Sequence, residues 1–153
     1  MRTIKFRGKK LTNGVWAYGS LVYLDENGAA IYVQTGNGSA MVMDLVYVHP
    51  DTVCQFTGLL DKNGKEIYDG DVLRSDKYPY SCIEIEERDN YFGVIEWNEN
   101  EAAFYIVTIK NPKSSVKGIS DGISDYLSKS ALQDFEVIGN INDDEWKRFR
   151  EHL

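Results

Sequence analysis

Short runs rich in Val, Ile, Tyr and Phe alternate with turns rich in Gly, Asn and Asp along most of this chain. Four Asn-Gly pairs occur within its 153 residues. Asn-Gly readily adopts the positive φ angles of tight turns, which join neighbouring antiparallel strands. This alternation predicts a mainly β fold and leaves little of the chain for helices.

The runs that predict strands are 3–7, 15–24, 30–35, 41–48, 82–87, 91–97, 103–109 and 135–141. In the first run, alternation is expected to place Ile4 and Phe6 on one face and Lys5 and Arg7 on the other. Residues 111–130 are polar and rich in Gly and Ser, so they predict a surface excursion. A short helical turn is expected near 124–132.

A C-terminal helix is predicted over 142–152. Asn142 is a candidate cap, and Glu145 stands three residues later, as a capping box requires. Ile141 and Trp146 occupy the positions of a hydrophobic staple. The apolar stripe of this helix has to pack against another part of the domain and consists of Trp146, Phe149 and Leu153.

The length and a hydrophobic content of 42% suit one compact domain over 1–153. The alternative is two β lobes, about 1–75 and 76–141, closed by the helix. A repeated pattern bears on this choice. Residues 6–18 and 56–68 both read F-x-G-x4-N-G-x3-Y, so one strand–turn–strand unit is written twice, as an internal duplication would produce.

The net charge is −7 and the sequence pI is about 4.8, so the surface as a whole should repel nucleic acid and anionic membranes. No apolar run approaches the roughly 20 residues of a membrane helix, and the N-terminus lacks the apolar core of a secretory signal. Cys54 and Cys82 are too few for a disulfide scaffold. A reduced protein in the cytoplasm is therefore expected.

Turn acids in the stretch 55–73 suggest a calcium loop, the candidate ligands being Asp61, Asn63, Asp69 and Asp71. An EF-hand loop that begins at Asp61 needs Gly at its sixth place and Glu at its twelfth. Those places hold Glu66 and Val72, so the template fails. Because Asp and Asn are common turn formers, the stretch is interpreted as architecture, with no metal and no cofactor expected.

Other candidate chemistry does not form a catalytic set. His49, Cys54 and His152 have no spacing that pairs a thiol with an oriented base, and Cys54 is expected to be a buried small residue. Glu84 and Glu86 should lie on a solvent face opposite Ile83 and Ile85. The full carboxylate run, which could instead form an acidic patch for a basic partner, comprises Glu84, Glu86, Glu87, Asp89, Glu96, Glu99 and Glu101.

The first ten residues carry five positive charges and no negative ones: Arg2, Lys5, Arg7, Lys9 and Lys10. Such clusters bind phosphates, which would make this strand a nucleic-acid site. Lysines also protect edge strands against aggregation, and the acidic chain as a whole favours this second explanation.

Three motifs carry a family resemblance: IKFRGK, VHPDTVCQFTGLLDKNGKEIYDGDVL and FEVIGNI, which span residues 4–141 in this order. Together they resemble the YopX-like family of phage and prophage proteins. The resemblance implies a mostly β fold with barrel-like parts, and no reaction or functional residue follows from it. Residues 74–134 match the family least, so partner specificity could vary there. Gly70-Asp71-Val72 is similar to a strand entry in SH3-like barrels.

These observations predict small barrel-like, SH3-like β units followed by a C-terminal helix. The expected function is that of a non-enzymatic phage or prophage accessory protein that binds another protein. The alternative is a small-barrel nucleic-acid-binding protein that uses the basic N-terminal strand. The sequence predicts no catalytic residue.

Overall fold

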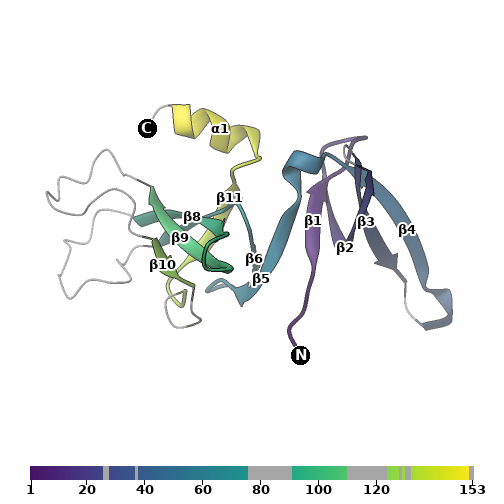
Figure 1. The fold of residues 1–153 in the computed structure, drawn as a ribbon, viewed down its shortest axis with the longest axis horizontal. Coiled ribbons are helices and arrows are strands. Elements are labelled where there is room, and N and C mark those ends of the chain that lie inside the picture. The colour runs from purple at the N-terminus through teal and green to yellow at the C-terminus, as the bar shows by residue number, and fades with distance from the viewer. Residues whose placement is uncertain are drawn as a thin grey trace, which may run out of the picture. The chain divides into compact units, whose positions relative to one another are not determined.

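The computed structural model describes residues 1–25, 28–36, 38–75, 91–109, 124–127, 129 and 132–151. The chain divides into two compact units, residues 1–58 and 59–153 (Figure 1). Each unit is built around antiparallel β-strands and has its own hydrophobic core.

The first unit is a curled antiparallel sheet of consecutive strands. Its elements are β1 (Phe6–Lys9), β2 (Trp16–Asp25), β3 (Gly28–Thr35), η1 (Gly38–Ala40), β4 (Val42–Val48), η2 (Pro50–Thr52) and β5 (Cys54–Leu60). The sheet order is β4-β3-β2-β1-β5-β6, and β5 runs past the boundary between the units to reach β6.

One face of this sheet, called here the inner face, carries the core of the unit. Its buried members are Ala17, Ala29, Ile31 and Val48. A Cβ atom on Gly8 would lie 2.8 Å from Cγ2 of Val48, so only glycine lets the end of β4 approach β1 this closely. The sheet therefore curls until the end of β4 meets the end of β1.

Only a few residues join these two strand ends. The backbone N–H of Leu11 donates to the carbonyl of Tyr47 (3.1 Å), and that of His49 donates to the carbonyl of Lys9 (2.8 Å). Lys10 and Val48 form the bridge between these two bonds. Over the described residues, no closed barrel results, because β1 accompanies β4 for this short distance alone.

The second unit holds a five-stranded sheet in the order β10-β9-β8-β7-β11. Its elements are β6 (Glu66–Tyr68), β7 (Asp71–Ser75), β8 (Tyr91–Asn98), β9 (Ala103–Ile109), β10 (Ser124–Tyr126), β11 (Glu136–Asn140) and α1 (Asp144–Glu151). Its main core cluster is Ile67, Leu73, Tyr91, Ile95, Phe104, Ile106, Leu132 and Phe135.

The mainly β prediction with a C-terminal helix is confirmed. The helical turn predicted near 124–132 is wrong, because residues 124–126 form β10 and pair with β9. The predicted strand 82–87 and most of the excursion 111–130 lie outside the described residues. β6 and β7 belong to the second unit, since Ile67 and Leu73 pack in its core, whereas the two-lobe alternative considered from the sequence divided the chain near residue 75.

The repeated sequence pattern forms the same local structure twice. β1 pairs with β2 around a turn in which Gly14 has φ 69°, and β5 leads to β6 through a turn in which Gly64 has φ 80°. The two Asn-Gly pairs therefore supply the positive φ angles that the sequence predicted. Both copies are strand–turn–strand units.

The helix α1 begins later than its predicted cap. The carbonyl of Asp143 accepts the first helical bonds, from the N–H groups of Trp146 (3.0 Å) and Lys147 (3.1 Å). Asn142 is not the cap, because the turn before the helix is already held by Asn140, whose Oδ1 accepts the N–H of Asn142 at 3.0 Å. The Ile141–Trp146 staple contact is confirmed within a cluster that also contains Val72 and Val94.

Trp146→Ala tests whether this cluster holds the helix in place. Truncating a buried aromatic residue costs about 3–5 kcal/mol, so the variant should melt at a clearly lower temperature, independently of protein concentration. Lys147→Ala is the matched control, because that side chain is exposed and its contact with Asp144 is a surface pair at 3.9 Å. Equal melting temperatures for both variants would show that Trp146 does not brace the helix.

Candidate binding surface

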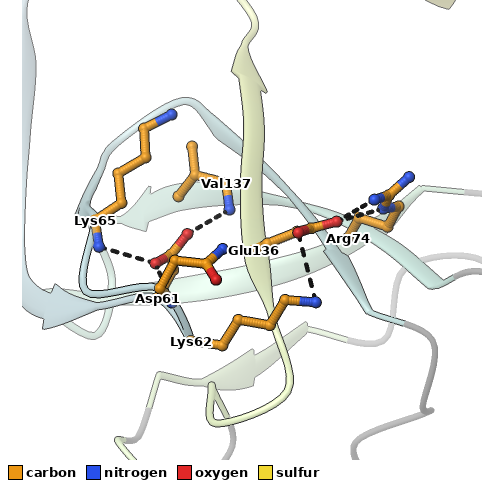
Figure 2. Close-up of polar contacts among 7 residues, drawn as sticks. Asp61, Lys62, Lys65, Arg74, Glu136 and Val137 are labelled. Carbon is orange, nitrogen blue, oxygen red and sulfur yellow. Dashed lines mark hydrogen bonds and ion pairs between the residues drawn. The ribbon is translucent and has the colours of Figure 1, made fainter.

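Acidic turn residues of the stretch 55–73 accept hydrogen bonds from backbone N–H groups. Oδ1 of Asp61 accepts hydrogen bonds from the N–H groups of Asn63 (2.8 Å) and Lys65 (2.9 Å). Its Oδ2 accepts the N–H of Val137 at 2.9 Å. Figure 2 shows this carboxylate between the turn and β11. Asp61 is buried, and three backbone donors offset the cost of burying its charge.

A second carboxylate, that of Glu136, belongs to β11 itself and is partly exposed. Glu136 lies between Lys62, whose Nζ is 3.5 Å from Oε2, and Arg74, whose Nε donates to Oε1 at 2.7 Å (Figure 2). The Arg74 hydrogen bond lowers the pKa of the Glu136 carboxyl below its ordinary value. These groups are partly exposed, so the pairs contribute modestly to stability.

Asp71 is fully buried at the start of β7 and acts in the same way as Asp61. Its Oδ2 accepts the N–H of Tyr68 at 2.8 Å, and its Oδ1 accepts an Nδ2–H of Asn140 at 3.1 Å. Gly70 has φ 73° and Val72 is fully buried, as the predicted strand entry requires. Asp71 therefore closes the turn that admits β7 to the core.

Asp69 differs, because burial raises its pKa above the ordinary value of 3.8. The negative charges of Glu96 and Asp71 raise it further, against the backbone N–H groups of Gly70 and Trp97. No three carboxylate, imidazole or thiol side chains converge on one point within the part of the chain that the structure describes. Asp61, Asp69 and Asp71 accept hydrogen bonds that hold turns and a strand contact.

The other sequence candidates lie apart or outside the described residues. The thiol of Cys54 is buried and donates to the carbonyl of Thr52 at 3.3 Å, as expected of a small core residue. His49 is exposed and precedes η2. His152 and the acidic run 84–89 fall outside the described residues. The described acids of the same run are exposed and are Glu96, Glu99 and Glu101.

Three members of the basic N-terminal cluster lie beside aromatic rings. Lys5 stands 5.9 Å from the Tyr18 ring centroid, and Lys9 stands 5.3 Å from that of Trp16. The guanidinium of Arg7 is 4.4 Å from the Trp16 centroid, and Arg7 is only 4% exposed. Lys5 and Lys9 are partly exposed, and of the five cluster members only Arg7 and Lys9 belong to β1.

The face opposite the core of the first unit gathers exposed apolar and aromatic side chains. Residues that pair directly across strands share a face. Tyr32 pairs with Leu45, and Ala30 pairs with Tyr47, while the alternate pairs of these strands point into the core. The outer face is defined here by side chains that are 38–55% exposed, namely Tyr18, Tyr32, Met43, Leu45 and Tyr47.

Sequence reasoning identified the strands that carry this surface but not the surface itself. The alternation of Met43, Leu45 and Tyr47 in 41–48 was the available signal. It could not show which alternate set faces the core, because both sets are mainly apolar and the set that packs inward includes Asp44. Strand register across β2, β3 and β4 brings these side chains together, and register is a tertiary property.

Comparison with known proteins identifies a family and one similar fold. A family model described as YopX protein matches residues 5–145. The crystal structure of protein EF1440 from Enterococcus faecalis is similar, with a TM-score of 0.55 and 17% sequence identity, covering 95% of this chain and 97% of that one. A search of curated proteins found no match.

None of the helices among the described residues has the length and apolar character needed to cross a membrane.

Gly64→Val tests the architectural role of the stretch 55–73. No atom lies within 4 Å of a Cβ placed on Gly64, so the substitution strains only the backbone at positive φ. It should lower the free energy of unfolding by about 1 kcal/mol or more. Gly64→Asn, which tolerates this conformation, should stay close to the parent in chemical denaturation. A clear rise in the parent's melting temperature with millimolar calcium or magnesium would contradict the architectural role.

Asp69→Asn tests the raised pKa. The folded state binds this proton more tightly than the unfolded state, so stability falls as pH rises from the unfolded pKa through the folded pKa. The variant should therefore melt above the parent at pH 7, and the difference should shrink below about pH 4. Glu99→Gln, at an exposed acid, should match the parent at both pH values. An Asp69→Asn variant that melts lower at pH 7 would refute this assignment.

Proposed function

The chain belongs to the YopX protein family, and we propose that it is a non-enzymatic phage or prophage accessory protein that binds another protein through the outer face of its first unit. The observation that carries the proposal is this face itself. Three exposed tyrosines, a methionine and a leucine are contiguous over three neighbouring strands. Tyrosine is enriched in protein interfaces because its ring is large, rigid and amphipathic.

Contiguity distinguishes this face from scattered surface residues. Tyr18 lies two residues before Ser20, which pairs with Tyr32, and Tyr47 lies two residues after Leu45, the partner of Tyr32 on β4. The three tyrosines therefore follow a diagonal across β2, β3 and β4. Diagonal neighbours in a sheet are about 7–8 Å apart, so one partner surface could contact all three rings.

The absence of enzymatic activity is part of the proposal and has its own support. The oxygens of the two buried acids Asp61 and Asp71 accept hydrogen bonds from backbone N–H groups and from Asn140. The thiol of Cys54 donates to a carbonyl. We place the protein in the cytoplasm of the bacterial host, where the partner would be a phage or host protein.

Paired variants of the full chain test the proposal. The parent, Tyr32→Ala/Tyr47→Ala and Tyr23→Ala are used to capture binding partners from a lysate of the natural host, and bound protein and nucleic acid are both identified. Tyr23 is the matched control because it is 72% exposed but pairs with Ala29, a residue of the inner face.

A protein retained by the parent and by Tyr23→Ala, and lost by the double variant, is the expected result. Far-ultraviolet circular dichroism and thermal melts should show all three folded. Partners retained equally by all three would contradict binding through the outer face.

A second candidate function, single-stranded nucleic-acid binding, is favoured by the charge distribution. Residues 1–58 hold five Lys and Arg against four Asp and Glu, a net charge of +1, whereas residues 59–153 hold 12 against 20, a net charge of −8. The objection from overall acidity therefore weakens for the first unit. Lys5 borders the exposed Tyr18, Lys9 borders the half-buried Trp16, and bases stack on such rings.

We expect this second function to fail a direct test. Fluorescence anisotropy with a labelled 15-nucleotide single strand should show no submicromolar binding at about 150 mM salt, because only two partly exposed lysines border the rings and each phosphate contact weakens with salt. Submicromolar binding that is abolished in Lys5→Gln/Lys9→Gln but kept in Lys129→Gln would make nucleic acid the primary ligand.

A further inference from the structure

The outer edge of β4 presents backbone groups in a known orientation. Within an antiparallel strand, the N–H and C=O of one residue point to the same side, and successive residues alternate. The carbonyl of Tyr47 and the N–H of His49 bond to the β1 side, away from β3. By alternation, Met43 and Leu45 also direct their N–H and C=O groups away from β3, whereas Asp44 directs its groups toward β3.

This edge is left open where β1 turns away. β4 is the terminal strand of its sheet, and the end of β1 accompanies it only from His49 back to Tyr47. The chain then turns at residues 11–13 into β2. Among the described residues, no strand continues this row beside Met43 and Leu45, so a slot for an extended segment lies in line with the end of β1.

The side chains beside the slot are suited to a second strand. Met43 and Leu45, whose backbone groups open outward, and the neighbouring Tyr47 also carry exposed side chains of the outer face. The backbone of an added strand would form hydrogen bonds with the outward N–H and C=O groups of β4. Every second side chain of that strand would lie beside the side chains of the outer face. Leu11, which is exposed and bonded to Tyr47, borders one end of the slot.

From this geometry we infer that β4 receives an extended segment of another protein by strand addition, and this inference rests on the proposed function of the outer face. The segment has alternating apolar residues that lie over the outer face. It has a Lys or Arg at an intervening position, opposite Asp44. That aspartate is exposed and is the one charged residue of β4. An incoming strand must therefore either place a positive charge beside it or leave it solvated.

The same charge argues against a second copy of this chain as the occupant. The carbonyl of Tyr47 is already bonded to Leu11, so antiparallel pairing of two β4 edges through Met43 and Leu45 is centred on Asp44. It places the two Asp44 side chains directly opposite each other, and like charges at such positions are unfavourable. A partner strand with a basic residue there removes this conflict.

The test uses a library of synthetic ten-residue peptides that alternate Val, Ile or Tyr with Lys, Arg, Thr or Glu. The library is screened against the full chain, and the selected peptides are measured by fluorescence anisotropy. Leu45→Ala removes the side chain, whereas Leu45→Pro also removes the outward N–H without taking a bond from β3. Proline is tolerated at such edge positions. Both variants are checked by thermal melting.

Strand addition predicts that selected peptides bind Leu45→Pro about tenfold or more weakly than Leu45→Ala, the loss that a single hydrogen bond of about 1.4 kcal/mol produces. N-methylation should abolish binding only at every second peptide residue, where the N–H points toward β4. This measurement tests strand addition even if Leu45→Pro fails to fold. Selected peptides should contain Lys or Arg and should bind Asp44→Asn more weakly.

Other outcomes overturn the inference in distinguishable ways. Equal weakening by Leu45→Ala and Leu45→Pro, with no effect of N-methylation, would leave docking on the outer face but exclude strand addition. Binding unaffected by both variants and by Tyr32→Ala would contradict the proposed function as well. Failure to select any peptide would refute the strand slot. A dimer at about 10 µM that Leu45→Pro dissociates would assign the edge to a second copy.

Discussion

The approach of Val48 to Gly8 sets the form of the first unit and the position of its free edge. Any larger residue at position 8 would place a Cβ within 2.8 Å of the valine side chain. Because glycine stands there, the end of β4 reaches β1, and the inner face closes over Ala17, Ala29 and Ile31. The same contact fixes the point beyond which β4 has no neighbouring strand on its outer side among the described residues. Core closure and the open slot thus follow from one close approach.

The second unit depends on a different constraint, which is the burial of charged turn residues. Asp61 joins a local turn to β11, a strand 76 residues further along the chain, through one carboxylate. Asp71 does the same for the turn before β7 and for Asn140. Removing a buried acceptor leaves backbone donors without partners, which is costly. Asp61 and Asp71, which resemble ligands of a metal loop in the sequence, therefore have a structural role.

Local sequence signals predicted the turns and strands that depend on neighbouring residues. Asn-Gly pairs located the turns at Gly14 and Gly64, and alternation located most strands. The helical turn predicted near 124–132 was wrong because residues 124–126 obtain their backbone partners from β9. The predicted cap at Asn142 was wrong because Asn140, which donates to Asp71, holds the turn before the helix by accepting the N–H of Asn142. Both errors concern partners that are distant in the chain.

The candidate surface was not predictable for a related reason. Both alternate sets of residues in β4 are mainly apolar, and the charged Asp44 belongs to the set that packs inward, so periodicity alone cannot tell which set is buried. The choice is made by pairing with β3, where Val46 meets Ile31 in the core and Leu45 meets Tyr32 outside. Basic residues were found by charge, but the burial of Arg7 beside Trp16 required the pairing of β1 with β2.

Amide hydrogen exchange of the free full chain, resolved residue by residue by NMR, tests the central claim that the outer edge of β4 is open. If the edge is open, exchange is slow for Asp44 and Val46, whose N–H groups face β3, and fast for Met43 and Leu45, whose N–H groups face the slot. Slow exchange at all four residues would contradict an open edge, because it would show that the edge is already paired.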